Sequence, residues 1–302
     1  MNKTLLVIVG PTAVGKTAFA IELAKKYSSE IISADSRQFY KEMKIGTARP
    51  DGAELENIPH HLLGHISIHQ NYTVADFVKD ANEKVLALFK ERDFLIMCGG
   101  SGLYVDAFCN GLDDLPDSDP EIKNKLNHIF EQEGIAPLQK QLADLDPVYY
   151  QSIDNNNPHR LIRAIEVCLI TGKKFSELRR GKKVVHPFRI IKIALNSDRK
   201  YLYERINLRV LSMMKQGLFE EVNNLYPHRK LKALKTVGYT EWFDFIDGKI
   251  NKEQAVELIQ QNSRRYAKRQ LTWFRKDANL NWIDLADWEK AIAKAVQLID
   301  EN

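Results

Sequence analysis

The sequence predicts an α/β protein in which helices flank a parallel β-sheet and an all-helical segment interrupts that sheet. Short apolar runs alternate with helical patterns over the first hundred residues or so, which is the element order typical of a parallel sheet. From about Leu112 no strand candidate follows until Phe188. We therefore expect an α/β core made of residues 1–112 and 188–302, with residues 113–187 inserted as a helical domain. A chain of 302 residues is long enough to bury a sizeable core.

The N-terminal third supplies most of the expected sheet. Thr4–Val9 (TLLVIV) is an apolar run of strand length, and a helical pattern over Gly15–Tyr27 follows it. Glu30–Ser33 and Phe94–Cys98 are two further short strands. Between them, Val74–Arg92 spaces its apolar residues as one face of an amphipathic helix does.

The C-terminal third begins with one more strand, Phe188–Leu195 (FRIIKIAL). Asp198 has the side chain of a good helix N-cap, and we expect a helix from there through Lys215 that ends at Gly217. After this helix the chain is expected to close with helices and no further strand.

Composition and charge are those of an ordinary globular protein. The chain has 44% hydrophobic and 28% charged residues, and Lys plus Arg exceed Asp plus Glu by only four, 44 against 40. So small a surplus does not by itself indicate a nucleic-acid partner. No apolar run is long enough to span a bilayer and no signal-peptide pattern follows Met1, so we expect a cytoplasmic protein with no membrane association. A monomer is expected because the sequence carries no strong dimerisation signal.

Residues 10–17 (GPTAVGKT) match the phosphate-binding P-loop pattern G-x-x-x-x-G-K-[ST]. The pattern follows an apolar strand and opens a helix, which is the context that it requires. Backbone amides and the helix N-terminus attract phosphate oxygens, Lys16 reaches across, and the Thr17 hydroxyl can hold Mg²⁺. Such a loop recognises a diphosphate without specifying a nucleotide. The residues expected to bind diphosphate are Gly10, Pro11, Thr12, Ala13, Val14, Gly15, Lys16 and Thr17.

Two other segments follow strands and are expected at the same edge of the sheet as the P-loop, where open α/β folds bind ligands. The first begins at Asp35, after the strand Glu30–Ser33. Asp35 is a candidate general base or metal ligand, and helix capping is its equally ordinary alternative role. The second is Gly99–Tyr104 (GGSGLY), in which Ser101 offers a hydroxyl to the edge. A plain strand-to-helix turn explains this second segment nearly as well.

Positive charge is concentrated near the C-terminus. The run Gln260–Lys276 (QQNSRRYAKRQLTWFRK) holds six basic residues and no acidic one. On a helix, Arg264 stacks with Lys268, and Arg265 stacks with Arg269, into a basic face. A solvated helix face is one interpretation, and a surface for polyphosphate, RNA in particular, is the other.

Seven segments together resemble bacterial tRNA dimethylallyltransferases, also called tRNA isopentenyltransferases, over essentially the whole chain. They are GPTAVGKT at Gly10, DSRQFYKEMKIGTARP at Asp35, PHHLL at Pro59, GGSGLY at Gly99, NPHRLIRAIEV at Asn157, RINLRVLSMMKQGLFEEV at Arg205 and RRYAKRQLTWFR at Arg264. This ordered series is far more specific than a P-loop alone. Two positions depart from the family pattern, because Val14 stands where many members have Ser, and Ser101 where Thr is frequent.

The resemblance implies a P-loop NTPase-like core and an enzyme that uses dimethylallyl diphosphate, Mg²⁺ and the anticodon stem-loop of tRNA. The dimethylallyl group would move to the exocyclic amine of the adenosine 3′ of the anticodon, with release of diphosphate. Asp35 would accept a proton from that amine, Ser101 would orient the reacting groups, and Arg209 would contact the diphosphate. Together with the basic helix, the residues expected to contact tRNA are Asp35, Ser36, Arg37, Gln38, Ser101, Lys123, His159, Arg160, Leu161, Ile162, Arg163, Arg264, Arg265, Lys268 and Arg269.

The main alternative is a P-loop kinase that phosphorylates a small metabolite or nucleotide with ATP. Such a kinase would need no tRNA, and the basic C-terminal helix and the Asn157 segment would then have no role. A non-catalytic RNA-binding protein is a third hypothesis, and it leaves the P-loop and Asp35 unexplained.

Overall fold

The computed structural model describes residues 3–179, 181 and 184–301, and the chain divides into two compact units. One unit is made of Met1–Cys109 and Val185–Asn302, and the other of Asn110–Val184. The boundaries expected from the sequence, 113 and 187, each lie three residues after those of the smaller unit, 110 and 184.

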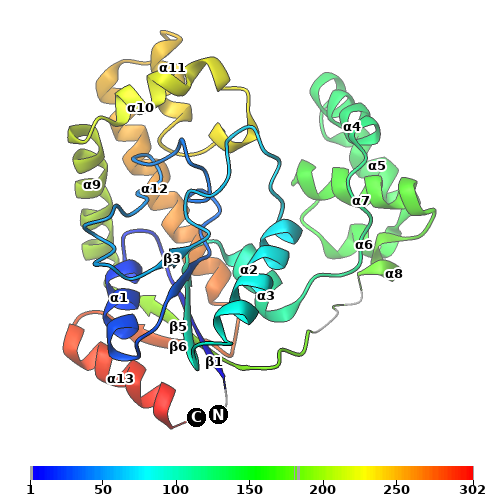
Figure 1. The fold of residues 1–302 in the computed structure, drawn as a ribbon. Helices are drawn as coiled ribbons and strands as arrows, with labels where there is room; N and C mark the ends of the chain where they lie inside the picture. The colour runs from blue at the N-terminus through cyan, green and yellow to red at the C-terminus, as the bar shows by residue number, and fades with distance from the viewer. Residues whose placement is uncertain (1–2, 180, 182–183, 302) are drawn as a thin grey trace. The chain divides into compact units, whose positions relative to one another are not determined.

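Within the described residues of the larger unit, six strands form one parallel sheet in the order β3-β2-β4-β1-β5-β6. Helices lie on both sides of this sheet (Figure 1). The central strand β1 pairs with β4 on one side and with β5 on the other. The strands are β1 (Thr4–Val9), β2 (Ile31–Ser33), β3 (His60–His61), β4 (Phe94–Gly99), β5 (Arg189–Asn196) and β6 (Asn281–Asp284).

The side chains of β1 alternate between two apolar cores. Leu5, Val7 and Val9 belong to one core, and Leu6 and Ile8 belong to the other, because successive residues of a strand point to opposite faces. Every residue of β1 is buried, as is typical of a parallel strand with helices on both faces. The first core includes residues of α2 (Val74–Leu88) and α3 (Gly102–Asn110), and the second includes residues of α1 (Lys16–Lys26) and α13 (Trp288–Asp300).

The remaining helices of the larger unit lie between β5 and β6 in the sequence. As predicted, Asp198 caps the first of them, accepting hydrogen bonds from the backbone N–H groups of Lys200 (2.9 Å) and Tyr201 (3.2 Å). Gly217 follows that helix with a φ of 95°, a left-handed conformation that favours glycine. These helices are α9 (Arg199–Lys215), α10 (Leu218–Leu225), α11 (Thr240–Ile246) and α12 (Lys252–Phe274), with 3-10 turns at Tyr226–His228 and Lys232–Leu234.

Two element predictions need correction. The chain does not close with helices alone, because β6 pairs with β5 from Ile193–Asn281 to Asn196–Asp284. This strand has four residues and only Ile283 is buried, so no apolar run announces it. The helix expected over Val74–Arg92 ends at Leu88, and turns occupy the residues after it.

The smaller unit is all-helical, as predicted. Its helices are α4 (Pro120–Glu133), α5 (Ala136–Leu145), α6 (Pro147–Ser152), α7 (Pro158–Thr171) and α8 (Phe175–Leu178). Asp119, Asp146 and Asn157 cap α4, α6 and α7, and each cap precedes a proline at the first helical position. Among the described residues of the whole chain, no helix has the length and apolar character needed to cross a membrane.

Replacing Ile283 tests the contribution of β6 to the fold. Ile283 is 1% exposed in the core that it shares with α1 and α13. We expect Ile283→Ala to lower the free energy of unfolding by about 2–4 kcal/mol, because a large side chain is removed from a packed core. The exposed Asn281→Ala on the same strand should cost less than about 1 kcal/mol. Denaturant unfolding measures both, and equal effects would contradict a core role for β6.

Candidate active site

The P-loop has the predicted place, between the end of β1 and the first turn of α1. The Lys16 ammonium donates to the carbonyl oxygens of Gly10 (3.0 Å) and Pro11 (2.8 Å), so the loop wraps around its own lysine. Gly10 has a φ of 150°, and a Cβ there would lie 2.7 Å from the carbonyl oxygen of Leu195 on β5. Glycine at this position therefore permits the close packing of the loop against the sheet.

Burial lowers the pKa of the Lys16 ammonium to about 8. The positive charge of Arg209 lowers it further, whereas Cys98 and Asp35 oppose the shift. A diphosphate beside Lys16 would favour its charged form.

Two pockets adjoin the P-loop. The first, here called the P-loop pocket, has a volume of about 450 Å³ and is lined by P-loop residues that include Lys16 and Thr17. The second, here called the Tyr266 pocket, has a volume of about 340 Å³ and lies between α9, α12 and the loop before α11. The lining residues that the two pockets share are Thr12, Asp35, Thr47 and Arg209.

Asp35 therefore faces both pockets, as its place after β2 predicted. Its carboxylate lies close enough to Lys16 and Arg209 to act on the pKa of each. One of its oxygens also accepts a hydrogen bond from the backbone N–H of Arg37 (3.0 Å). Asp35 thus closes a local turn and caps no helix, since no helix of the described chain follows β2 before β3, and its carboxylate lines both pockets.

Arg209 reaches the same place from α9. Its guanidinium donates to the hydroxyl of Thr12 in the P-loop, and burial lowers its pKa to about 10. The Nε atom of Arg209 is buried and has no hydrogen-bond partner in the described part of the chain. A half-buried cation whose buried Nε donor is open, beside a phosphate-binding loop, suits an anionic ligand.

Ser101 is buried, and its hydroxyl is hydrogen-bonded to a neighbouring residue. Its hydroxyl accepts a hydrogen bond from the backbone N–H of Ser36 (2.8 Å) and donates to the Ser36 hydroxyl (3.0 Å). Burial raises the pKa of the Tyr266 phenol on α12, and Ser101 lies close enough to that phenol to lower this pKa in part. Ser101 therefore fastens the segment after β2 and lies beside α12.

Gln270 is a site residue that the sequence analysis missed. It is 5% exposed, and its Oε1 accepts from the backbone N–H of Thr12 (2.8 Å) while its Nε2 donates to the carbonyl of Gly100 (2.8 Å). A Cβ on Gly100 would lie 2.3 Å from that Nε2. One amide thus ties the P-loop to the end of β4. In the sequence, Gln270 is one neutral residue within a basic run. That position does not predict a hydrogen-bonded link between the P-loop and β4.

Known proteins resemble this chain over most of its length. Residues 38–277 match the model of the IPP transferase family. The chain is 52% identical to the tRNA dimethylallyltransferase of Christiangramia forsetii, with 97% of each chain covered, and 48% identical to that of Flavobacterium johnsoniae, with 93% of each covered. This chain belongs to the tRNA dimethylallyltransferase family. That membership favours the transferase over the kinase alternative.

Solved structures agree with the family membership. The full-length tRNA isopentenylpyrophosphate transferase of Bacillus halodurans has a TM-score of 0.74 at 36% identity, covering 99% of this chain and 96% of that one. A eukaryotic dimethylallyltransferase, described as acting on tRNA, has a TM-score of 0.84 at 26% identity, covering 99% and 80% respectively. These matches support the predicted P-loop NTPase-like fold.

The segment after Asp35, expected to contact tRNA in this family, is partly used inside the protein. The Gln38 amide nitrogen donates to the carbonyls of Thr47 (3.1 Å) and Ala48 (3.0 Å). The Arg37 guanidinium donates to the carbonyl of Ala233 (3.0 Å). Reading of a base edge by the Gln38 N–H donors would therefore require exchange of these bonds.

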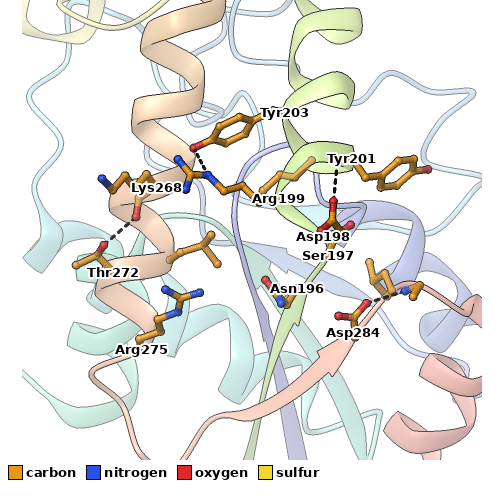
Figure 2. A pocket seen from close by; sticks show the side chains of 14 residues that line it. Asn196, Ser197, Asp198, Arg199, Tyr201, Tyr203, Lys268, Thr272, Arg275 and Asp284 are labelled. Atoms are coloured by element: carbon orange, nitrogen blue, oxygen red, sulfur yellow. Dashed lines mark hydrogen bonds between the residues drawn. The ribbon is translucent and has the colours of Figure 1, made fainter.

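The basic residues of α12 do not form one uniform surface. Arg264 is half-buried and donates to the side chain of Asn207 on α9 (2.5 Å), whereas Arg265 is exposed. Arg269 lines the Tyr266 pocket. Lys268 instead lines a third cavity, of about 780 Å³, at the ends of β5 and β6 (Figure 2). Consecutive residues of a helix point about 100° apart, so Lys268 and Arg269 face different cavities.

The third cavity is lined by more basic than acidic side chains. Arg199, Lys268 and Arg275 line it, and within the described chain none of these three has a carboxylate at ion-pair distance. The two carboxylates that line it accept backbone hydrogen bonds in the turns drawn in Figure 2, Asp198 at the start of α9 and Asp284 at the end of β6. The cavity wall therefore keeps a net positive charge.

In the helical unit, the predicted tRNA-contacting residues divide by burial. Leu161 and Ile162 are 0% and 4% exposed in the apolar core of that unit, so their side chains hold α7 in place and are closed to RNA. Arg163 is paired with Glu166 (2.9 Å) and also donates to the carbonyl of Pro116 (2.6 Å). The predicted residues with exposed side chains are Lys123 on α4 and His159 and Arg160 on α7.

The bridge made by Gln270 gives a testable prediction. Gln270→Leu leaves the Thr12 N–H and the Gly100 carbonyl without partners, and each buried unsatisfied group costs about 1–3 kcal/mol. We expect a lower free energy of unfolding and weaker binding of inorganic diphosphate. Gln270→Glu, which can still accept from Thr12, should lose less of both. Wild-type diphosphate affinity in Gln270→Leu, measured by calorimetry, would contradict this role.

Proposed function

We propose that this protein transfers a dimethylallyl group from dimethylallyl diphosphate to the exocyclic amine of the adenosine 3′ of the anticodon in tRNA, with release of diphosphate. The observation that carries the proposal is the wall shared by the P-loop pocket and the Tyr266 pocket. A diphosphate bound in the first and an adenine entering the second would meet at Asp35 and Arg209.

The diphosphate side of the site stabilises the leaving group. As the bond between the allylic carbon and the diphosphate oxygen breaks, negative charge increases on that oxygen. The P-loop amides, Lys16 and Arg209 are held in advance around the P-loop pocket, so they stabilise this charge with little reorganisation. Val210, Met213 and Ile259 line the Tyr266 pocket and offer apolar surface to the five-carbon group.

The nucleoside side supplies the proton acceptor. The adenine amine forms the new C–N bond and loses a proton, which Asp35 accepts. Since this base is stacked in the anticodon loop, it has to leave the stack to reach the Tyr266 pocket. Ser36, Tyr266 and Arg269 line that pocket and offer polar contacts to the nucleoside. Ser101 orients the reacting groups indirectly, through its bonds to Ser36 and its place beside Tyr266.

The residues around the P-loop fit a magnesium ion. The Thr17 hydroxyl and the Asp35 carboxylate line the same pocket, and Mg²⁺ prefers oxygen ligands of this kind. The described residues contain no group of three or more His, Cys, Asp or Glu side chains that could hold a metal. Thr17 would therefore hold the ion together with oxygens of the diphosphate. When bound, Mg²⁺ neutralises part of the charge of the leaving group.

Binding of tRNA would use both units. We assign phosphate contacts to Arg265, Lys268 and Arg269 on α12, and to Lys123 and Arg160 in the helical unit, since cationic side chains that water can reach attract the RNA backbone. The exposed His159 would add a ring N–H donor to a phosphate oxygen. Arg264 and Arg163 would contribute their charge while they remain bonded to neighbours. We further propose that the enzyme works as a monomer in the cytoplasm, where its tRNA substrate is found.

One assay tests the whole proposal. The protein is incubated with Mg²⁺, labelled dimethylallyl diphosphate and unmodified tRNA that carries adenosine 3′ of the anticodon. We expect label in tRNA at that adenosine and release of diphosphate. A tRNA with guanosine at this position is the control. Transfer of phosphate from ATP to a small molecule, with no label in tRNA, would favour the kinase instead.

The role of Asp35 is tested by Asp35→Ala. Loss of a general base lowers turnover by about 10²-fold or more. Affinity for tRNA should change little, because the carboxylate acts on the proton of the amine. Single-turnover kinetics and a filter-binding assay separate the two quantities. A collapse of tRNA affinity with unchanged single-turnover chemistry would make Asp35 a binding residue.

The basic residues of α12 are tested through salt dependence. Neutralising Arg264, Arg265 and Lys268 should weaken tRNA binding and flatten the dependence of the affinity on salt, because each phosphate contact releases a counterion. Lys252→Gln, exposed on the same helix but outside the basic run, is the control. If the salt dependence of tRNA affinity is unchanged in the triple variant, these side chains do not contact RNA phosphates and form only a solvated helix face.

A further inference from the structure

The wall between the two pockets includes a loop without helix or strand, residues 44–48 (KIGTA), here called the 44–48 loop. Thr47 lines both pockets, Gly46 lines the Tyr266 pocket, and Ala48 lines the P-loop pocket. The position of this loop therefore sets the space in which the two substrates meet.

A single carboxylate holds the first half of the loop. One oxygen of Glu221 on α10 accepts hydrogen bonds from the backbone N–H groups of Lys44 (3.0 Å) and Ile45 (2.7 Å). The other oxygen accepts from the N–H of Gly46 (2.9 Å) and from the Tyr239 phenol (2.7 Å). Four donors thus converge on one side chain, and the two oxygens of a carboxyl group supply enough acceptor sites for all of them.

The Tyr239 ring packs against the backbone of the 44–48 loop at Gly46. Its ring is fully buried, and a Cβ on Gly46 would lie 2.6 Å from it, so the backbone at residue 46 rests directly against the ring. Burial, together with the nearby Glu221, raises the pKa of Tyr239, which keeps the phenol protonated as a donor. At the other end of the loop, Gln38 donates to the carbonyls of Thr47 and Ala48.

We propose that Glu221 is a positioning residue for prenyl transfer. It lines neither pocket, and it acts by fixing the 44–48 loop so that Thr47 stands beside Asp35 and Arg209 in the shared wall. This inference rests on the proposed function, because the loop matters only if both substrates meet at that wall. A role in stability alone would anchor α10 without any effect on how the substrates bind.

The decisive variant is Glu221→Gln, which has nearly the same shape but places an NH₂ group where two donors converge. A misplacement of about 1 Å at a reacting centre costs up to about 100-fold in rate. We expect kcat/KM for dimethylallyl diphosphate to fall by about 10- to 100-fold, with KM raised as well as kcat lowered. The matched control is Glu220→Gln, an exposed neighbour on α10, which should keep wild-type constants.

The split between KM and kcat separates positioning from stability. A stability role alone reduces the fraction of active enzyme, so kcat per total protein falls while KM stays at the wild-type value. Tyr239→Phe removes one of the four donors, so it should raise KM and lower kcat by smaller factors than Glu221→Gln. It provides the test of positioning if Glu221→Gln does not fold. Wild-type KM in both variants would overturn the inference. Absence of transfer by the wild-type enzyme would instead refute the proposed function.

Discussion

The site depends on the parallel pairing of β1 with its two neighbours. Val9 is in register with Gly99 of β4 and with Ala194 of β5, so β1 and β4 end at the same level of the sheet and β5 ends two residues further on, at Asn196. The P-loop, the Gly100–Ser101 turn and the approach to α9 therefore begin side by side. The candidate active site lies at this edge, because parallel strands place their carboxyl ends together.

The electrostatic design of the site follows from burial. Lys16 and Arg209 are both half-buried, and desolvation lowers the pKa of each. The charge of Arg209 lowers the pKa of Lys16 further, whereas the Asp35 carboxylate acts to raise both pKa values. Two desolvated cations that share one carboxylate favour an additional anion, and a diphosphate supplies it. The free site is thus arranged for a ligand of opposite charge, at the expense of its own electrostatic stability.

The different faces of helix α12 contact different parts of the larger unit. Gln270 bonds the P-loop and Tyr266 lies beside Ser101, while Arg269 lines the Tyr266 pocket and Lys268 faces another cavity. One long helix therefore contributes to the P-loop side of the site and places basic side chains in two cavities. Under the proposed function, this helix would serve both the chemistry and the binding of the tRNA backbone.

Local sequence determined much of this protein. The apolar run Thr4–Val9, the glycines and lysine of the P-loop and the Asp198 cap specify their own conformations, because each depends on neighbours in the chain. They predict the fold class and the conformation of the P-loop, the stretch without strands after Leu112 predicts the helical insertion, and the family resemblance predicts the activity. The strand β6 escaped prediction because its four residues carry one buried side chain, and its partner lies about ninety residues earlier.

Tertiary structure alone decided which side chains meet. Gln270 contacts Thr12 from 258 positions away, and Glu221 contacts Ile45 from 176 positions away. It also decided that Leu161 and Ile162 are core and that the basic run of α12 divides between cavities. Spacing along a helix predicts which residues share a face, but what that face meets depends on how distant elements pack.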